Sequence, residues 1–181
     1  MIKNFHVLLL VEKLRIIWRT GLPLRVGLFN PGSGIVPGIP AIGALQGDTI
    51  WLDRTLLKDP FRLRNVVEHE VLHVRCALLR RSVRKSQILQ RAGASAYAFA
   101  SADHKMGHLL QRYENAGQDA HEEALVILVA SGARVACPEV KKAAQLLRLS
   151  AGWNPLNLLR ALCWLPMIVW TRHYTPGTPF S

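Results

Sequence analysis

Residues 59–85 read DPFRLRNVVEHEVLHVRCALLRRSVRK, and they carry the clearest helix signals of the chain. Asp59 offers an N-cap acceptor, and Pro60 follows at the first helical position, where proline is well tolerated. Apolar residues then recur at spacings of three and four, which predicts a helix with one face against a core. The basic run at 80–85 is expected to end the helix, because cations suit the negative end of the helix dipole.

Two histidines and a glutamate lie in the middle of this predicted helix. His69 and His73 are four residues apart and share a helical face, so they can hold one metal ion together. Glu70 is adjacent, close enough to accept a proton from a water on that ion. The alternative is a pair of core histidines. The apolar neighbours favour the metal, because a half-buried imidazole needs a partner.

Upstream, Gly47 and Asp48 predict a turn, and residues 49–53 predict a short strand. The combined stretch 47–74, GDTIWLDRTLLKDPFRLRNVVEHEVLHV, resembles the strand-then-helix core of the zincin metallopeptidases, in particular small gluzincin-like domains of bacterial and mobile-element proteins. The resemblance covers roughly residues 45–135, and the H-E-x-x-H pattern is its specific part. It implies zinc, a water nucleophile, peptide-bond hydrolysis, and a strand that borders the cleft and can pair with an extended substrate. The chain lacks the third histidine of the longer H-E-x-x-H-x-x-G-x-x-H signature, so a metzincin is not expected.

A catalytic zinc requires a third protein ligand, and the best source is the segment 119–130. This segment predicts a buried helix with an acidic first turn. At about 100° per residue, Glu123 falls within about 20° of Arg134 on the polar edge, whereas Glu122 falls about 180° from Ser131. The helical wheel therefore favours Glu122 as the ligand.

Two alternatives to Glu122 remain open. Family patterns of the form E-E-x-x-A, with the second glutamate as ligand, favour Glu123. His121 is a third candidate, since it precedes Ala124 by three residues, as the ligand does in helices with an E-x-x-A pattern. Our order of preference is Glu122, then Glu123.

A second histidine pair, His104 and His108, is also spaced by four residues and could bind metal. Gly107 lies between them and no acid does, so we interpret them as a surface pair. The preceding alanine-rich run at 92–102 predicts either a close-packed helix or an adaptable cover over the cleft.

Length and composition predict one globular domain. The chain has 181 residues, half of them hydrophobic, which is enough for a sizeable core. We expect an N-terminal helix within 1–22, a catalytic core at 24–135, C-terminal helices at 136–174 and a tail at 175–181. Three scattered cysteines lack metal-ligand spacing and are interpreted as core residues: Cys76, Cys137 and Cys163. Their odd, sparse count favours a reducing, cytoplasmic location.

The net charge of +11 favours acidic partners or an anionic surface, although no nucleic-acid motif accompanies it. This charge supports an alternative function, a non-catalytic module that binds nucleic acid or a membrane surface and keeps a structural or vestigial zinc site. Neither end of the chain predicts a membrane span. The apolar run at 7–11 is short, and Arg160 and Pro166 interrupt the one at 156–170. The N-terminus also lacks a signal-peptide cleavage site.

These patterns together predict a mostly helical α+β fold, which the resemblance makes zincin-like. A helix at 5–18, closed by Gly21, precedes a small antiparallel sheet in which residues 24–29 are candidates to pair with 49–52. The sheet is expected to pack on the helix that carries His69 and His73. The expected activity is zinc-dependent hydrolysis of a protein or peptide substrate, with Glu70 as general base.

Overall fold

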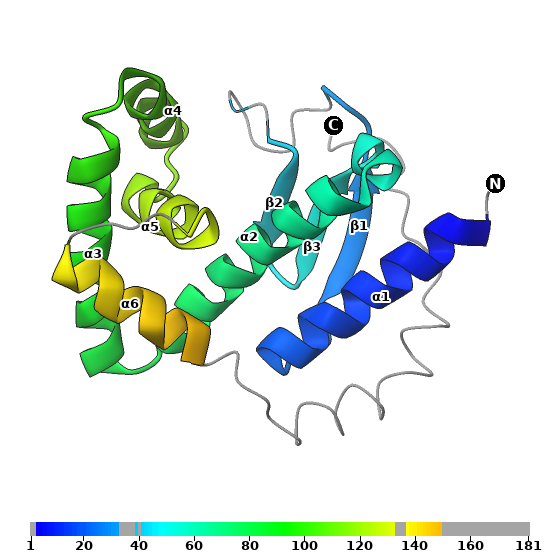
Figure 1. Cartoon of the computed structure of the whole chain (residues 1–181), viewed down its shortest axis with the longest axis horizontal. Coiled ribbons are helices and arrows are strands. Elements are labelled where there is room, and N and C mark those ends of the chain that lie inside the picture. The colour runs from blue at the N-terminus through cyan, green and yellow to red at the C-terminus, as the bar shows by residue number, and fades with distance from the viewer. Residues whose placement is uncertain (1–2, 33–38, 40, 133–136, 150–181) are drawn as a thin grey trace. The chain divides into compact units, whose positions relative to one another are not determined.

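A computed structural model describes residues 3–32, 39, 41–132 and 137–149. Residues 3–32 and 41–71 belong to one compact unit, and residues 72–132 and 137–149 belong to a second (Figure 1). Helix α2 (Pro60–Leu79) contributes residues to both units. The secondary structure is mostly helical with one small sheet, as the α+β prediction requires. The single domain expected from the chain length stays a prediction.

The first unit is built on a three-stranded sheet. Its elements, in chain order, are α1 (Lys3–Thr20), β1 (Arg25–Phe29), β2 (Gly43–Gln46), β3 (Thr49–Asp53), the 3-10 helix η1 (Arg54–Lys58) and the first part of α2. The strand order is β1-β3-β2. Strands β2 and β3 form an antiparallel hairpin whose turn uses Gly47 at a φ of 59°, a conformation that glycine adopts without strain.

The expected pairing of 24–29 with 49–52 is confirmed, since Arg25 lies opposite Thr49 and Leu28 opposite Leu52. The two strands run parallel, however, so the predicted antiparallel sheet is wrong and the sheet is mixed. The reason is β2, which the sequence analysis missed. It forms the hairpin with β3, and β1 therefore joins the other edge of β3 through a longer connection.

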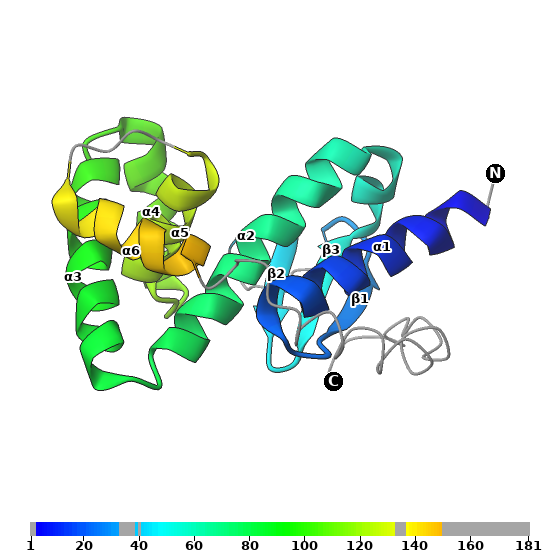
Figure 2. The same cartoon turned by 60° about the horizontal axis from the view of Figure 1, so that its bottom comes forward.

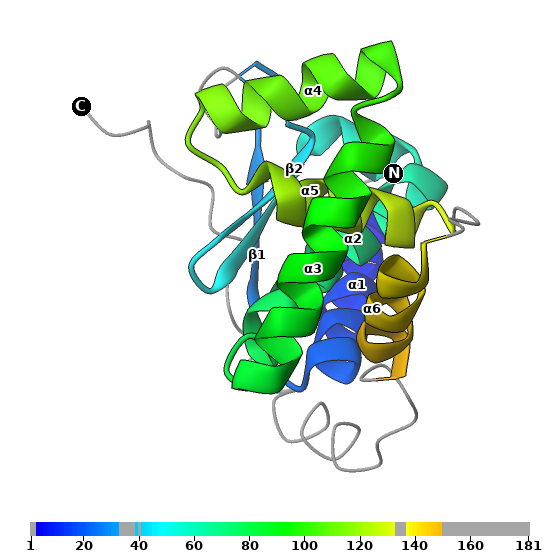
Figure 3. The same cartoon turned by 90° about the vertical axis from the view of Figure 1, so that its left-hand side faces the viewer.

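Helices α1 and the first part of α2 cover the same face of the sheet (Figures 1 and 3). The core between them is formed by Leu9 and Ile16 from α1, Val26, Ile50 and Leu52 from the sheet, Leu56 from η1, and Leu63, Val66, Val67 and Val71 from α2. Helix α1 ends as predicted, because Gly21 follows it at a φ of 70° and its N–H donates to the Ile17 carbonyl.

Helix α2 begins as predicted and ends earlier than predicted. Asp59 caps it, with its Oδ1 accepting a hydrogen bond from the Arg62 N–H at 3.0 Å. The helix stops at Leu79, so the basic run does not form its last turn. Residues 80–82 form a turn, and the remaining basic residues, Arg84 and Lys85, lie in the first turn of α3 (Val83–Ala100).

The second unit is a helical bundle, shown in Figure 2, that contains the end of α2 together with α3, α4 (His104–Asn115), α5 (Ala120–Ala130) and α6 (Pro138–Leu149). Helix α5 packs against α3, α4 and α6. The alanine-rich run is part of α3, with Ala92 and Ala96 fully buried, so the prediction of a close-packed helix is confirmed. At Gly93 an added Cβ would lie 3.2 Å from the His121 carbonyl oxygen, which shows how closely α3 approaches α5.

The predicted C-terminal helices are confirmed only for α6, since the apolar run at 156–170, the tail and Cys163 lie outside the described residues. Cys76 is fully buried, as expected of a core residue, and Cys137 is partly buried. Among the helices that the structure describes, none combines the length and the apolar character needed to cross a bilayer.

Candidate metal centre

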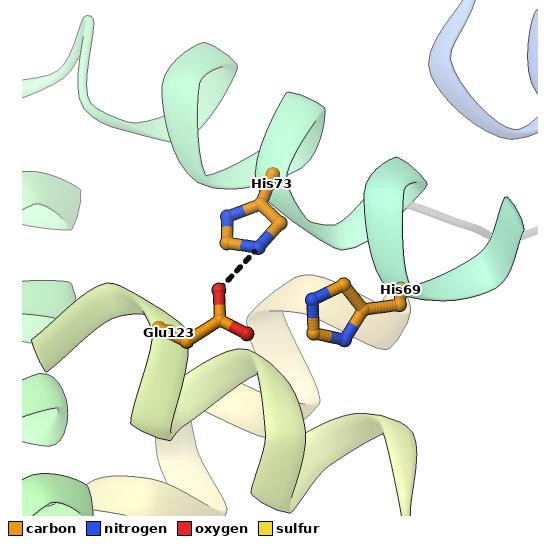
Figure 4. A group of neighbouring side chains, drawn as sticks. All are labelled: His69, His73 and Glu123. Atoms are coloured by element: carbon orange, nitrogen blue, oxygen red, sulfur yellow. Dashed lines mark ion pairs between the residues drawn. The ribbon is translucent and has the colours of Figure 1, made fainter. Parts of the chain in front are cut away.

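Three side chains from two helices converge on one small volume (Figure 4). His69 and His73 lie one turn apart on α2, and Glu123 lies in the first turn of α5. One potential ligand atom from each residue lies within 4.8 Å of the other two. The sequence prediction that His69 and His73 share a site is thus matched by their geometry.

The carboxylate of Glu123 faces Nε2 of the His73 imidazole. Its Oε2 lies 3.1 Å from Nε2 of that imidazole, and Glu123 is only 5% exposed. Two imidazoles and one carboxylate are thus grouped so that they could hold a metal ion. Imidazole nitrogen and carboxylate oxygen are both donors that zinc accepts.

The other nitrogen of His73 is held by Glu122. Nδ1 lies 2.7 Å from Glu122 Oε1, and because an ionised carboxylate can only accept, the imidazole must donate through Nδ1–H. Nε2 lies 3.1 Å from the Glu123 carboxylate, so both ring nitrogens of His73 face a carboxylate, and a metal ion at Nε2 would take the place of a proton there. A carboxylate on the far nitrogen of a ligating histidine is the usual support of a zinc ligand.

Glu122 is in turn held by a charged pair. Arg80 contacts Glu122 Oε2 at 2.9 Å and Asp119 Oδ2 at 2.8 Å. Asp119 also caps α5, since its Oδ1 accepts from the Glu122 N–H at 2.9 Å. Partial burial raises the pKa of Asp119, but the Glu122 N–H and the Arg80 guanidinium outweigh it and hold that pKa below its ordinary value.

The structure places Glu123, rather than our first choice Glu122, in the group that can hold a metal. The helical wheel was wrong to put Glu123 on a polar edge, because Glu123 is the more buried of the two. The wheel took Ser131 and Arg134 as that edge, but α5 ends at Ala130 and Ser131 is its C-cap. Buried side chains surround almost the whole of this short helix, so its sequence offers no polar face to orient it.

Glu70 is buried on α2 next to His69 and lies against strand β2. A Cβ added at Gly43 would lie 3.0 Å from Glu70 Oε1 and would clash with Val66 Cγ1 at 2.5 Å. Gly43 therefore permits β2 to approach the carboxylate of Glu70 closely. The expectation that the strand at 49–53 borders a cleft and pairs with an extended substrate stays a prediction.

His121, the third candidate ligand, is exposed and lies outside the group. Its ring makes an edge contact with Tyr97, with ring centroids 4.8 Å apart. It lines a polar pocket of about 390 Å³, together with Cys76, Arg80, Asp119 and Glu122. Burial, with a smaller contribution from the charge of Glu122, raises the pKa of Cys76 to about 12, so this thiol is unsuited to act as a nucleophile.

Comparison with protein-family models, with curated proteins and with solved structures finds no match to this chain. Any function must therefore be inferred from the site itself. Sequence reasoning missed Arg80 and Asp119 as supports of the site. The sequence signal for this support was the acidic start of α5. It does not indicate that Asp119 there would pair with Arg80, which lies 39 positions earlier in the chain.

Proposed function

We propose that the chain is a zinc-dependent metallopeptidase. The observation that carries the proposal is the convergence of His69, His73 and Glu123, with Glu70 adjacent to the first ligand. Three protein ligands and an open position are the arrangement of a catalytic zinc, whereas structural sites are usually closed by a fourth protein ligand.

In this proposal His69, His73 and Glu123 hold the zinc, which when bound supplies a Lewis acid and brings the pKa of a water towards neutrality. Glu70 accepts the proton of the attacking water and then passes it to the leaving amine. Glu122 keeps His73 in the tautomer that can ligate, and Arg80 holds Glu122 in place. The substrate is a peptide segment, and strand β2 lies beside Glu70 at Gly43.

The decisive variant is Glu70→Gln, which keeps the size of the side chain but removes the base. It should retain zinc and fold while losing roughly 10² to 10⁴-fold of the hydrolysis of an unfolded protein such as casein, which is the usual contribution of a general base. The matched control is Glu68→Gln on the same helix, where the glutamate pairs with Arg19 at 2.8 Å and has no role in the site.

Equal activity in Glu70→Gln and the native chain would contradict this mechanism. A native chain that binds zinc but cleaves no unfolded protein would also contradict it. That result would support the alternative of a non-catalytic, basic module with a structural or vestigial zinc site.

A further inference from the structure

Helix α4 presents two imidazoles that the proposed metallopeptidase site does not use. His104 and His108 are one turn apart and both exposed. Their Nε2 atoms lie 3.3 Å from each other, and the rings meet edge to face with centroids 4.5 Å apart. The two Nε2 atoms therefore lie next to each other at the surface.

The separation of the two nitrogens matches a shared metal ion. Zinc–imidazole bonds are about 2.1 Å long, and two nitrogens 3.3 Å apart at that distance from one ion subtend an angle of about 104° at it, close to tetrahedral. Without an ion, the pair can be joined only if one Nε2 carries a proton and the other accepts it. A metal ion satisfies both lone pairs at once.

The backbone beneath the pair is already fixed. Asp103 caps α4, with its Oδ1 accepting from the Met106 N–H at 2.9 Å. Its carbonyl accepts from the Gly107 N–H at 2.7 Å. Gly107 also lets α4 approach the preceding turn, since an added Cβ would lie 3.1 Å from the Ser101 carbonyl oxygen. The backbone of the first turn of α4, which carries His104, is thus anchored.

We propose that His104 and His108 form a second, exposed binding site for a divalent transition-metal ion of the zinc, nickel or copper class. Imidazole suits these ions, whereas magnesium and calcium require oxygen ligands. With two protein ligands, the remaining positions belong to water, so the ion exchanges readily and binds more weakly than at a three-ligand site. We assign the pair binding and no hydrolysis.

The test is a calorimetric titration of the metal-free, full-length chain with Ni²⁺, followed by competition with Zn²⁺. The native chain should show the α4 site, and His104→Ala and His108→Ala should each weaken it by roughly tenfold or more, because one imidazole alone holds the ion poorly. His6→Ala is the matched control, since it removes an exposed histidine from α1 and should leave the site intact. Circular dichroism establishes that each variant is folded.

Nickel binding that is the same in the native chain, His104→Ala and His108→Ala overturns the proposal. If the native chain binds Mg²⁺ and both His104→Ala and His108→Ala lose that binding, the assigned class of metal is wrong. The result is independent of the proposed peptidase, because His73→Ala should remove the site between α2 and α5 and leave the α4 site unchanged. If only the α4 site binds metal, the further inference stands and the proposed function fails.

Discussion

At the scale of single residues, the two nitrogens of His73 have different partners. Glu122 and Glu123 are consecutive on α5 and therefore point about 100° apart, yet both reach the same imidazole, one at Nδ1 and the other at Nε2. Only the carboxylate at Nε2 shares its space with His69. Adjacent acids of equal charge thus have separate roles: Glu123 as the proposed ligand, and Glu122 as the group that orients His73.

This division predicts different losses of zinc affinity. Glu123→Ala should abolish stoichiometric zinc binding, since it removes one of three ligands. Glu122→Ala should weaken binding by about 10 to 100-fold, the usual effect of removing a partner of a ligating histidine. Competition with a chromophoric zinc chelator measures both affinities.

The matched control for this pair is Glu114→Ala, an exposed acid on α4. It should leave zinc affinity at the site between α2 and α5 unchanged. If Glu122→Ala loses zinc and Glu123→Ala retains it, the ligand is Glu122, as the helical wheel predicted.

The sequence was sufficient to place His69 and His73 together, because their relation is local and set by the helical period. The role of Glu70 as base stays a prediction. The sequence was not sufficient for Glu123, because the choice between neighbouring acids depends on where α5 ends and on which elements surround it. Arg80 illustrates the same limit. We interpreted it as a cation at the end of α2, but its partners, Asp119 and Glu122, lie on a different segment of the chain.

At the scale of elements, α5 is the helix whose position decides the site. Asp119 fixes its start through the Glu122 N–H and also binds Arg80 just beyond the end of α2. The close approach of α3 at Gly93 limits how α5 can rotate, since the His121 backbone is in contact there. The same residue that caps the helix therefore also fixes the support of His73.

Asp119→Ala should cost about 1 kcal/mol of unfolding free energy at neutral pH, the usual value of an N-cap, because the exposed ion pair with Arg80 adds little. The pKa of Asp119 is lowered in the folded state. Its ionisation therefore stabilises the fold above the unfolded pKa of about 3.9, and this contribution is lost as the pH falls through the lower folded pKa.

Urea unfolding at a series of pH values checks this prediction. The difference between the native chain and Asp119→Ala should be largest near pH 7 and should shrink below about pH 4. Asp119→Asn is the matched variant, because asparagine also caps helices but carries no charge for Arg80. A difference that grows as the pH falls would contradict the assignment.

The helices were the most predictable elements because their signals lie within a few residues. Asp59 before α2 and Gly21 after α1 marked helix ends correctly. The sheet was less predictable. Strand β2 has only four residues, Gly43 to Gln46, which is too short for a clear alternating pattern. Strand β2 pairs with one edge of β3 and leaves the other edge for β1. Because the sequence did not reveal β2, it could not predict that β1 and β3 run parallel.

At the scale of the whole molecule, α2 contributes to two hydrophobic cores. Val67 belongs to the core of the first unit, and Leu79 belongs to the core of the second. The proposed zinc takes two ligands from α2 and one from α5, and because it would bind the folded chain in preference to the unfolded one, it should raise the stability of the fold.

Zinc should raise the unfolding temperature because it binds the folded chain and only weakly the unfolded one. At free zinc about 100-fold above its dissociation constant, the stabilisation is about 2.7 kcal/mol. For a chain of 181 residues this corresponds to a rise of about 5 to 10 °C in the unfolding midpoint. Differential scanning calorimetry with zinc and after chelation measures the difference.

Two variants decide whether this rise comes from the site between α2 and α5. His73→Ala should remove the dependence on zinc, because it takes away a ligand together with the partner of Glu122 and Glu123. His104→Ala should keep it, because the α4 pair is exposed, has only two ligands and binds more weakly. A rise that persists in His73→Ala but disappears in His104→Ala would place the stabilising metal on α4, and the H-E-x-x-H pattern would then no longer be evidence for a zinc centre in this chain.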